Sequence, residues 1–278
     1  LETTLSKEIV LDWCTKKSYE KQENLCSRAS MIRQFAIYID SLGVYAYVIP
    51  KNHFKSGERY VPYIFTDDEL KRFFQETDKC HYCSQCPYRH LIMPIFFRLL
   101  YSCGLRVSEA ILLKIKDVDL DNVILTINQS KKDNSRLVPM TDELLKRCQI
   151  YSKAVHSWSD DERYFFPLIE NKPMTIGNIY KNFRKFLFKA GISHGGRGFG
   201  PRVHDLRHLF CLHCLKKWFE EGKDLMTYLP ILRVYLGHDS FFETAYYLRL
   251  TADVFPQITL KLETVYKNLI PVLEGRCL

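Results

Sequence analysis

The sequence predicts a mainly helical protein with one small antiparallel β-hairpin, arranged in two domains. Apolar residues recur at three- and four-residue intervals through most of the 278 residues, which is the period of an amphipathic helix. Residues 122–128 (NVILTIN) and 137–139 (LVP) have strand composition, and the polar residues 129–135 between them indicate a turn. A chain of this length that is 46% apolar can form two domains, one of them with a sizeable core.

The first predicted domain, residues 1–49, is a small helical module. Its apolar residues have helical spacing on both sides of a polar break at residues 16–21 (KKSYEK). Residues 50–62 follow with little periodicity and are predicted to be an interdomain linker. Lys51, Lys55 and Arg59 make this linker basic enough to lie against phosphates, although an ordinary surface loop is equally consistent with its composition.

The second predicted domain, residues 63–278, begins with two helices and a short third one. Thr66 and Glu69 form a capping-box pair, so a helix is expected from Thr66 to about residue 80. The next helix covers about residues 89–103 and ends at Gly104, its expected left-handed cap. Arg106 follows directly, before a short helix at about residues 108–113. The predicted hairpin comes next, with Lys131 and Lys132 in its turn.

Six more helices complete the predicted fold. They are expected at about residues 141–155, 175–190, 204–219 and 226–235, and then from a Ser240/Glu243 capping box toward residue 250. A last helix is expected at about residues 253–273. The loop at residues 193–202 is rich in glycine and arginine, including Arg202, and is a candidate phosphate-contacting segment.

Composition limits the class of protein. The 40 basic and 32 acidic residues give a net charge of +8, which suits a polyanionic partner if the excess lies on one face, although a merely basic protein is as consistent with it. No uninterrupted apolar stretch is long enough to span a membrane, and no signal pattern is evident, so we expect a cytoplasmic protein. The first residue is Leu, which suggests that an upstream segment is missing.

The cysteines are expected to be reduced, because ten of them occur without an export signal. Cys80, Cys83 and Cys86 have the spacing of soft metal ligands, with His81 and His90 nearby. A structural zinc site normally uses two separated ligand pairs, and no second pair is evident. We therefore favour free thiols in a loop between helices and predict no metal site.

Residues 204–247 concentrate groups suited to attack on a phosphodiester. Arginine binds two phosphate oxygens with its planar fork and stays protonated, so two arginines can neutralise a pentavalent phosphorus without a metal ion. A tyrosine is a weak nucleophile at neutral pH unless cations and a base assist it, and a lysine can protonate the leaving oxygen. Taken singly, each of the candidate residues named below more often has a structural role. The groups within this stretch are His204, Arg207, His238 and the Tyr246–Tyr247 pair, and Arg106 and Lys131 lie upstream of it.

The order and spacing of these residues resemble the tyrosine recombinase (phage-type integrase) family. One matching box is residues 101–109 (YSCGLRVSE), which holds the first arginine. The other runs from residues 204–208 (HDLRH) through residues 236–238 (LGH), with Tyr247 nine residues after His238. The resemblance covers residues 60–278 and implies the two-domain architecture of that family, in which the helical N-terminal module is the core-binding, DNA-binding domain and the second domain is catalytic.

The resemblance also implies a role for each residue. Arg106 and Arg207 would clamp the scissile phosphate, His204 would assist proton transfer, and His238 would contact a phosphate oxygen. Tyr247 would form a 3′-phosphotyrosyl link. The general acid would be Lys131, eight residues before Pro139, with Lys132 as the alternative and as a further candidate DNA contact. Glu109 is expected to orient Arg106, and His208 is interpreted as structural.

We therefore expect a site-specific recombinase or integrase of a mobile element that needs no metal, ATP or other cofactor. Its partners would be two double-stranded DNA sites, with a homotetramer on the DNA and accessory directionality factors. Two alternatives remain at this point. A type IB topoisomerase would use the same chemistry to relax supercoils as a monomer, and a DNA-binding protein without catalysis would have no use for the phenol.

Overall fold

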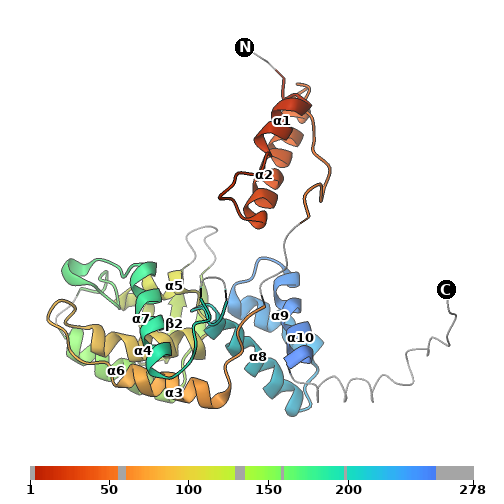
Figure 1. Ribbon diagram of the computed structural model, residues 1–278. Coiled ribbons are helices and arrows are strands. Elements are labelled where there is room, and N and C mark those ends of the chain that lie inside the picture. Colours follow the sequence, from red (N-terminus) through yellow and green to blue (C-terminus); the bar gives the residue numbers. More distant parts are fainter. Residues whose placement is uncertain (1–3, 56–60, 129–134, 158–159, 197–198, 255–278) are drawn as a thin grey trace. The chain divides into compact units, whose positions relative to one another are not determined.

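The computed structural model describes residues 4–55, 61–128, 135–157, 160–196 and 199–254. The chain divides into two compact units, Leu1–Val61 and Pro62–Leu278. Figure 1 shows the helices of both units. The fold is mainly helical with a small antiparallel sheet, so the predicted fold class is confirmed.

The first unit contains two helices, α1 (Lys7–Trp13) and α2 (Gln22–Ser41). The predicted polar break lies between them. A small core of Val10, Cys14, Ala29 and Ile49 holds the helices to the segment that follows α2. That segment also pairs Ala46 with Leu5 in an isolated β-bridge, which ties both ends of the unit together.

The second unit contains the other eight α-helices of the described residues. The capping box of Thr66 and Glu69 is present at the start of α3, where each residue's side chain bonds the other's backbone N–H. Helices α3 to α10 agree with the predicted segments to within a few residues. Their bounds are α3 Asp67–Asp78, α4 Arg89–Ser102, α5 Val107–Ile111, α6 Asp142–Val155, α7 Ile176–Lys189, α8 Asp205–Glu220, α9 Leu225–Leu236 and α10 Phe241–Val254.

Two details at the C-terminal end differ from the sequence prediction. At the start of α10 the Ser240 side chain accepts from the backbone N–H of Phe242 rather than that of Glu243. The expected break before a last helix at residues 253–273 does not occur, because α10 continues without interruption through Val254. The rest of that predicted helix lies outside the described residues.

The sheet has three antiparallel strands in the order β1 (Val118–Asp119), β2 (Ile124–Ile127) and β3 (Arg136–Pro139). The predicted hairpin is β2 and β3, with Leu125 opposite Val138. The sequence did not predict β1, because two residues carry no readable periodicity. Lys131 and Lys132, which were predicted to lie in the turn, fall outside the described residues.

Two hydrophobic clusters meet along α8. The larger one surrounds α4, which packs on α3, α6 and α8 (Figure 1), and at its centre the Phe73 ring lies 5.3 Å from the Phe183 ring. The smaller cluster joins α8 to α9 and α10. Leu206 and Leu209 belong to the first cluster and Leu212 to the second. The first turns of α8 are therefore held from both sides, and the candidate active site is built there.

Among the described residues, we find no helix with the length and apolar character needed to cross a bilayer.

A substitution at Gly104 tests how closely these helices pack. Its φ is +59°, and a Cβ at this position would lie 2.5 Å from the Phe210 ring, which stacks on Tyr235. We expect Gly104→Ala to lower the free energy of unfolding by about 2–4 kcal/mol, from backbone strain and overpacking together. Gly222→Ala is the matched control, since it has a similar φ of +71° but open space around it. Equal losses for both variants in urea unfolding would contradict this account.

Candidate active site

Arg106 is held by the turn that begins at Gly104. It caps the N-terminus of α5, where its backbone N–H donates to Glu109 Oε2 at 2.8 Å. Its guanidinium donates to Glu109 Oε1 at 2.9 Å and to the carbonyl of Gly237 at 2.8 Å. The side chain stays 34% exposed. The short sequence Gly-Leu-Arg therefore places a fixed, accessible cation beside the end of α9.

Arg207 lies in the first turn of α8 and is 1% exposed. Its guanidinium donates to the carbonyl of Gly104 at 2.7 Å and to that of Leu236 at 2.8 Å. Glu109 Oε2 lies 3.9 Å from it. Burial lowers the pKa of Arg207, and the nearby charge of Arg106 lowers it further. The two arginines predicted from sequence thus lie at one site, although about a hundred residues separate them.

A third arginine, Arg136 at the start of β3, completes this cluster. Its Nε donates to the carbonyl of Tyr235 at 2.8 Å, and its two terminal nitrogens donate to the carboxylate of Glu109 at 3.0 and 2.8 Å. Sequence reasoning missed Arg136, because the predicted returning strand began at Leu137. The sequence feature that could have indicated Arg136 is its position directly after the predicted turn that contains Lys131 and Lys132.

Three consecutive carbonyls at the C-terminal end of α9 each accept from a different arginine. Tyr235 accepts from Arg136, Leu236 from Arg207 and Gly237 from Arg106. The last carbonyls of a helix have no partner within it and carry its partial negative charge. They are therefore good partners for guanidinium groups. Gly237 ends the helix with a left-handed φ of 63°, and His238 follows at once.

Two histidines lie beside Tyr247, which is 3% exposed on α10, and a third histidine packs against one of them. The hydroxyl lies 2.8 Å from His208 Nδ1. The Tyr247 ring is parallel to the His238 ring, with 6.1 Å between the ring centres, and His238 Nδ1 lies 2.8 Å from Thr244 Oγ1. The His204 ring packs edge-on against His208 at 4.8 Å.

This arrangement changes the interpretation of His208, which the sequence analysis treated as structural. Its ring contacts the hydroxyl of the candidate nucleophile. His204 and His208 are one helical turn apart and so lie on the same face of α8. Tyr246, the other tyrosine of the pair, is half-buried and packs against the α8–α10 cluster. The structure thus brings Tyr247 together with the histidines.

The histidines are neutral near pH 7. Burial lowers the pKa of His204 to about 4, and burial with the charge of Arg207 nearby lowers those of His208 and His238 to about 3. Burial also raises the pKa of Tyr247, an effect that the charge of Arg207 opposes. Around neutral pH the imidazoles therefore act as hydrogen-bonding groups, while the positive charge resides on the arginines.

The remaining predicted residues lie elsewhere or outside the described residues. Lys51 and Lys55 belong to the first unit, where they line a cavity of about 470 Å³ that Arg33 also lines. Arg59 falls outside the described residues. Arg202 lies just before α8, and its backbone N–H donates to Asp205.

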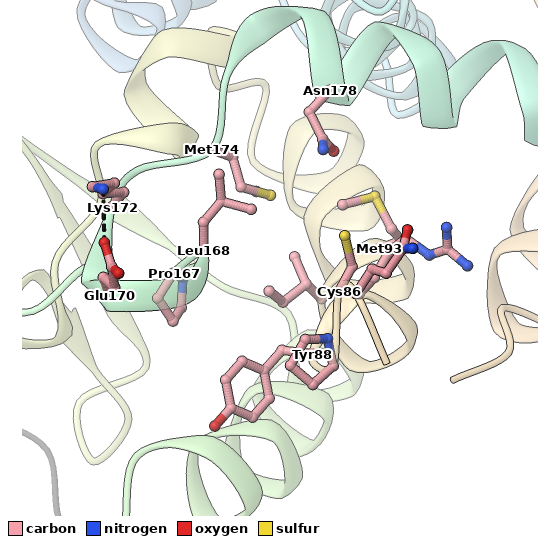
Figure 2. A pocket seen from close by; sticks show the side chains of 13 residues that line it. Cys86, Tyr88, Met93, Pro167, Leu168, Glu170, Lys172, Met174 and Asn178 are labelled. Carbon is pink, nitrogen blue, oxygen red and sulfur yellow. Dashed lines mark hydrogen bonds and ion pairs between the residues drawn. The ribbon is translucent and has the colours of Figure 1, made fainter. Parts of the chain in front are cut away.

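The Cys80–Cys86 loop contains free thiols. Within the described ranges, no group of three or more His, Cys, Asp or Glu side chains is placed to hold a metal ion. A cavity of about 440 Å³ lies beside this loop and is lined by Cys86, Tyr88, Met93, Leu168 and Met174 among others (Figure 2). None of the candidate catalytic residues that the structure describes lines this cavity, and the three arginines of the cluster do not line it either.

Paired guanidiniums, neutral imidazoles and a buried phenol lie together at this site. Comparisons with known proteins show the family to which the chain belongs. The phage integrase family matches residues 64–253, which is more than half of the chain. A candidate integrase/recombinase of Sinorhizobium fredii, y4rB, is 28% identical over 270 residues, covering 95% of this chain and 86% of its own. The tyrosine recombinase XerA of Pyrococcus furiosus is 30% identical over 198 residues, covering 69% of this chain and 59% of its own.

A solved structure shows the same fold. The XerH site-specific recombinase bound to a palindromic difH substrate has a TM-score of 0.69 at 19% identity, covering 93% of this chain and 70% of that one. The chain therefore belongs to the phage integrase family, and it is a tyrosine recombinase, an enzyme of DNA cleavage and rejoining.

The lowered histidine pKa values make stability depend on pH. An unfolded histidine has a pKa of about 6.5, so below that pH the unfolded chain binds more protons than the folded one. Stability is then fully present above pH 6.5 and is lost as the pH falls toward 4. We expect His208→Asn to make this slope shallower by up to about 1.4 kcal/mol per pH unit between pH 6 and 5. Urea unfolding at several pH values measures the slope, and an unchanged slope would contradict the burial argument.

Proposed function

We propose that this enzyme cuts and rejoins DNA at specific sites by attack of the Tyr247 hydroxyl on a phosphodiester. The observation that carries the proposal is the convergence of three segments on one site. Arg106 comes from the start of α5, Arg207 from α8, and the phenol of Tyr247 from α10, where it contacts His208 and His238. A protein that only grips DNA has no use for a phenol among neutral imidazoles.

In the proposed reaction, Arg106 and Arg207 hold the non-bridging oxygens of the scissile phosphate and neutralise the charge of the pentavalent phosphorus. His204 hydrogen-bonds the phosphate and assists removal of the phenolic proton, and His238 contacts a phosphate oxygen. The bond between Tyr247 Oη and phosphorus forms while the bond to the 5′-oxygen breaks. Lys131 gives its proton to that oxygen, which leaves a 3′-phosphotyrosyl link and a free 5′-hydroxyl. Rejoining is the reverse sequence, so neither ATP nor a metal ion is consumed.

The burial of Tyr247 and Arg207 adds a step before the chemistry. Tyr247 is 3% exposed and Arg207 is 1% exposed, so a DNA phosphate reaches them only after the side chains around them shift. Arg106, at 34% side-chain exposure, is the group that an approaching phosphate meets first. We propose that contact with Arg106 precedes the rearrangement that brings Tyr247 to the phosphorus.

The other parts of the chain take supporting roles in this proposal. Residues 1–49 form the core-binding domain, residues 50–62 the linker, and residues 63–278 the catalytic domain. Lys51, Lys55, Arg59, Lys132 and Arg202 contact the DNA backbone, for which the overall charge of +8 is suitable. The enzyme works in the cytoplasm as a homotetramer on two DNA sites of a mobile element, with accessory factors setting the direction.

Covalent trapping tests the nucleophile. On a nicked suicide duplex that carries the recognition site, the wild-type enzyme is expected to become covalently attached, and Tyr247→Phe is expected to lose attachment entirely because it has no phenolic oxygen. Tyr246→Phe is the matched control and should retain it. Gel separation of the protein–DNA adduct measures both. The assignment of the nucleophile to Tyr247 is wrong if Tyr246→Phe abolishes the adduct while Tyr247→Phe retains it. Supercoil relaxation by the monomer without a defined site would indicate a topoisomerase instead.

A substrate with a sulfur leaving group tests the general acid. A thiolate leaves without protonation, so a 5′-bridging phosphorothioate removes the need for an acid. We expect Lys131→Ala to slow cleavage of the normal substrate by about a hundredfold or more and to cleave the sulfur substrate almost as fast as wild type. Lys132→Ala loses only a contact to the DNA backbone, so it should slow both substrates to the same extent and leave the ratio of their rates unchanged. The opposite behaviour of the two variants would assign the role to Lys132.

A further inference from the structure

Arg136 is a buried arginine for which the proposed chemistry has no role. Its side chain is 7% exposed. Both of its terminal nitrogens bond the carboxylate of Glu109, at 3.0 and 2.8 Å, and its Nε bonds the carbonyl of Tyr235. None of these contacts joins it to Arg106 or Arg207, and Glu109 is the group that links it to them.

Glu109 is the one carboxylate bonded to this group of arginines by the contacts described above. It also bonds Arg106 at 2.9 Å and lies 3.9 Å from Arg207. Burial opposes its ionisation, yet hydrogen bonds and charge from Arg136, with smaller effects from Arg106 and Arg207, lower its pKa below the usual range. Glu109 is therefore a carboxylate at neutral pH. Its negative charge would cancel part of the positive charge that a phosphate needs to meet.

The net charge of the three arginines and Glu109 indicates the role of Arg136. Three guanidiniums and one carboxylate leave two net positive charges, which matches the charge that a phosphorane develops on its oxygens. Without Arg136 the same group would hold one net positive charge. At low effective dielectric, a unit charge a few ångströms away changes the interaction with a phosphate strongly.

We propose that Arg136 is a positioning residue for strand cleavage. It occupies Glu109 with a bidentate ion pair, so that Glu109 orients Arg106 while the charges of Arg106 and Arg207 remain available to the scissile phosphate. This inference rests on the proposed function, because it assigns Arg136 to the phosphate clamp of that reaction.

A neutral phosphorus substrate distinguishes this role from a structural ion pair. In a methylphosphonate, one non-bridging oxygen is replaced by a methyl group, so the scissile group carries no negative charge to be clamped. On the suicide duplex, Arg136→Met is expected to form the Tyr247 adduct about tenfold to a hundredfold more slowly than wild type with the ordinary phosphodiester. With a methylphosphonate at the scissile position, the two enzymes should react within about threefold of each other.

Compensating variants make the test sharper. Arg136→Lys keeps the charge but loses the bidentate geometry, so its rate on the phosphodiester should fall between those of wild type and Arg136→Met. The double variant Arg136→Met/Glu109→Gln removes both buried charges, so it restores two net positive charges and should cleave the phosphodiester faster than Arg136→Met alone. It also avoids an unpaired buried carboxylate, which makes it the better-folded partner if Arg136→Met is unstable.

Arg98→Met is the matched control. Arg98 makes a bidentate ion pair with Asp78, at 2.8 and 2.7 Å, in the same unit but outside the arginine cluster. Its loss should lower stability and leave the ratio of the two substrates' rates unchanged.

The outcomes separate the two proposals. If wild type forms no adduct through Tyr247, the proposed function fails. If wild type forms the adduct but Arg136→Met slows both substrates equally, or the double variant is no faster than Arg136→Met, the role of Arg136 is overturned and it is a structural ion pair only.

Discussion

The contact between the C-terminal end of α9 and three arginines is the interaction on which the rest of the site depends. Burying a guanidinium costs several kcal/mol unless its charge and its N–H groups find partners. Tyr235, Leu236 and Gly237 supply one carbonyl each, and Glu109 supplies the counter-charge. In return, the arginines satisfy carbonyls that a helix leaves unpaired. The helix end and the phosphate clamp therefore stabilise each other, and neither would keep its geometry alone.

Two glycines give this contact its crossed geometry. Gly104 precedes Arg106 by two residues, but its carbonyl accepts from Arg207, and Gly237 precedes His238, but its carbonyl accepts from Arg106. Both have left-handed φ values, 59° and 63°, which other residues adopt only with strain. Arg207 is thus held by the turn that carries Arg106, and Arg106 is held by the turn that carries His238. The clamp is assembled only when α4, α8 and α9 are all packed, which couples the folding of the second unit to the formation of the site.

The sequence predicted what depends on local order and missed what depends on the packing of distant segments. Helical periodicity, the Thr66 cap and the glycine at the end of α4 are local signals, and the helices they predict are present. The nine-residue spacing after His238 selected Tyr247, which the structure brings together with the histidines. By contrast, nothing in the residues around Arg136 or His208 indicates that one pairs with Glu109 and the other contacts the phenol, because those partners lie 27 and 39 residues away along the chain. Strand β1 was too short for any periodic signal.

The neutral histidines explain how a buried phenol can stay unreactive until its substrate arrives. Burial raises the pKa of Tyr247 and lowers those of His204, His208 and His238, so the phenol keeps its proton and the imidazoles do not take it. Burial is the main cause of the low histidine pKa values, and nearby positive charge lowers them further. A phosphate beside Arg207 would offset that second effect and make an imidazole a better proton acceptor. The same anion brings the phosphorus that the phenoxide must attack. In this arrangement the substrate itself completes the conditions for its own cleavage, and a tyrosine with no phosphate beside it remains a weak nucleophile.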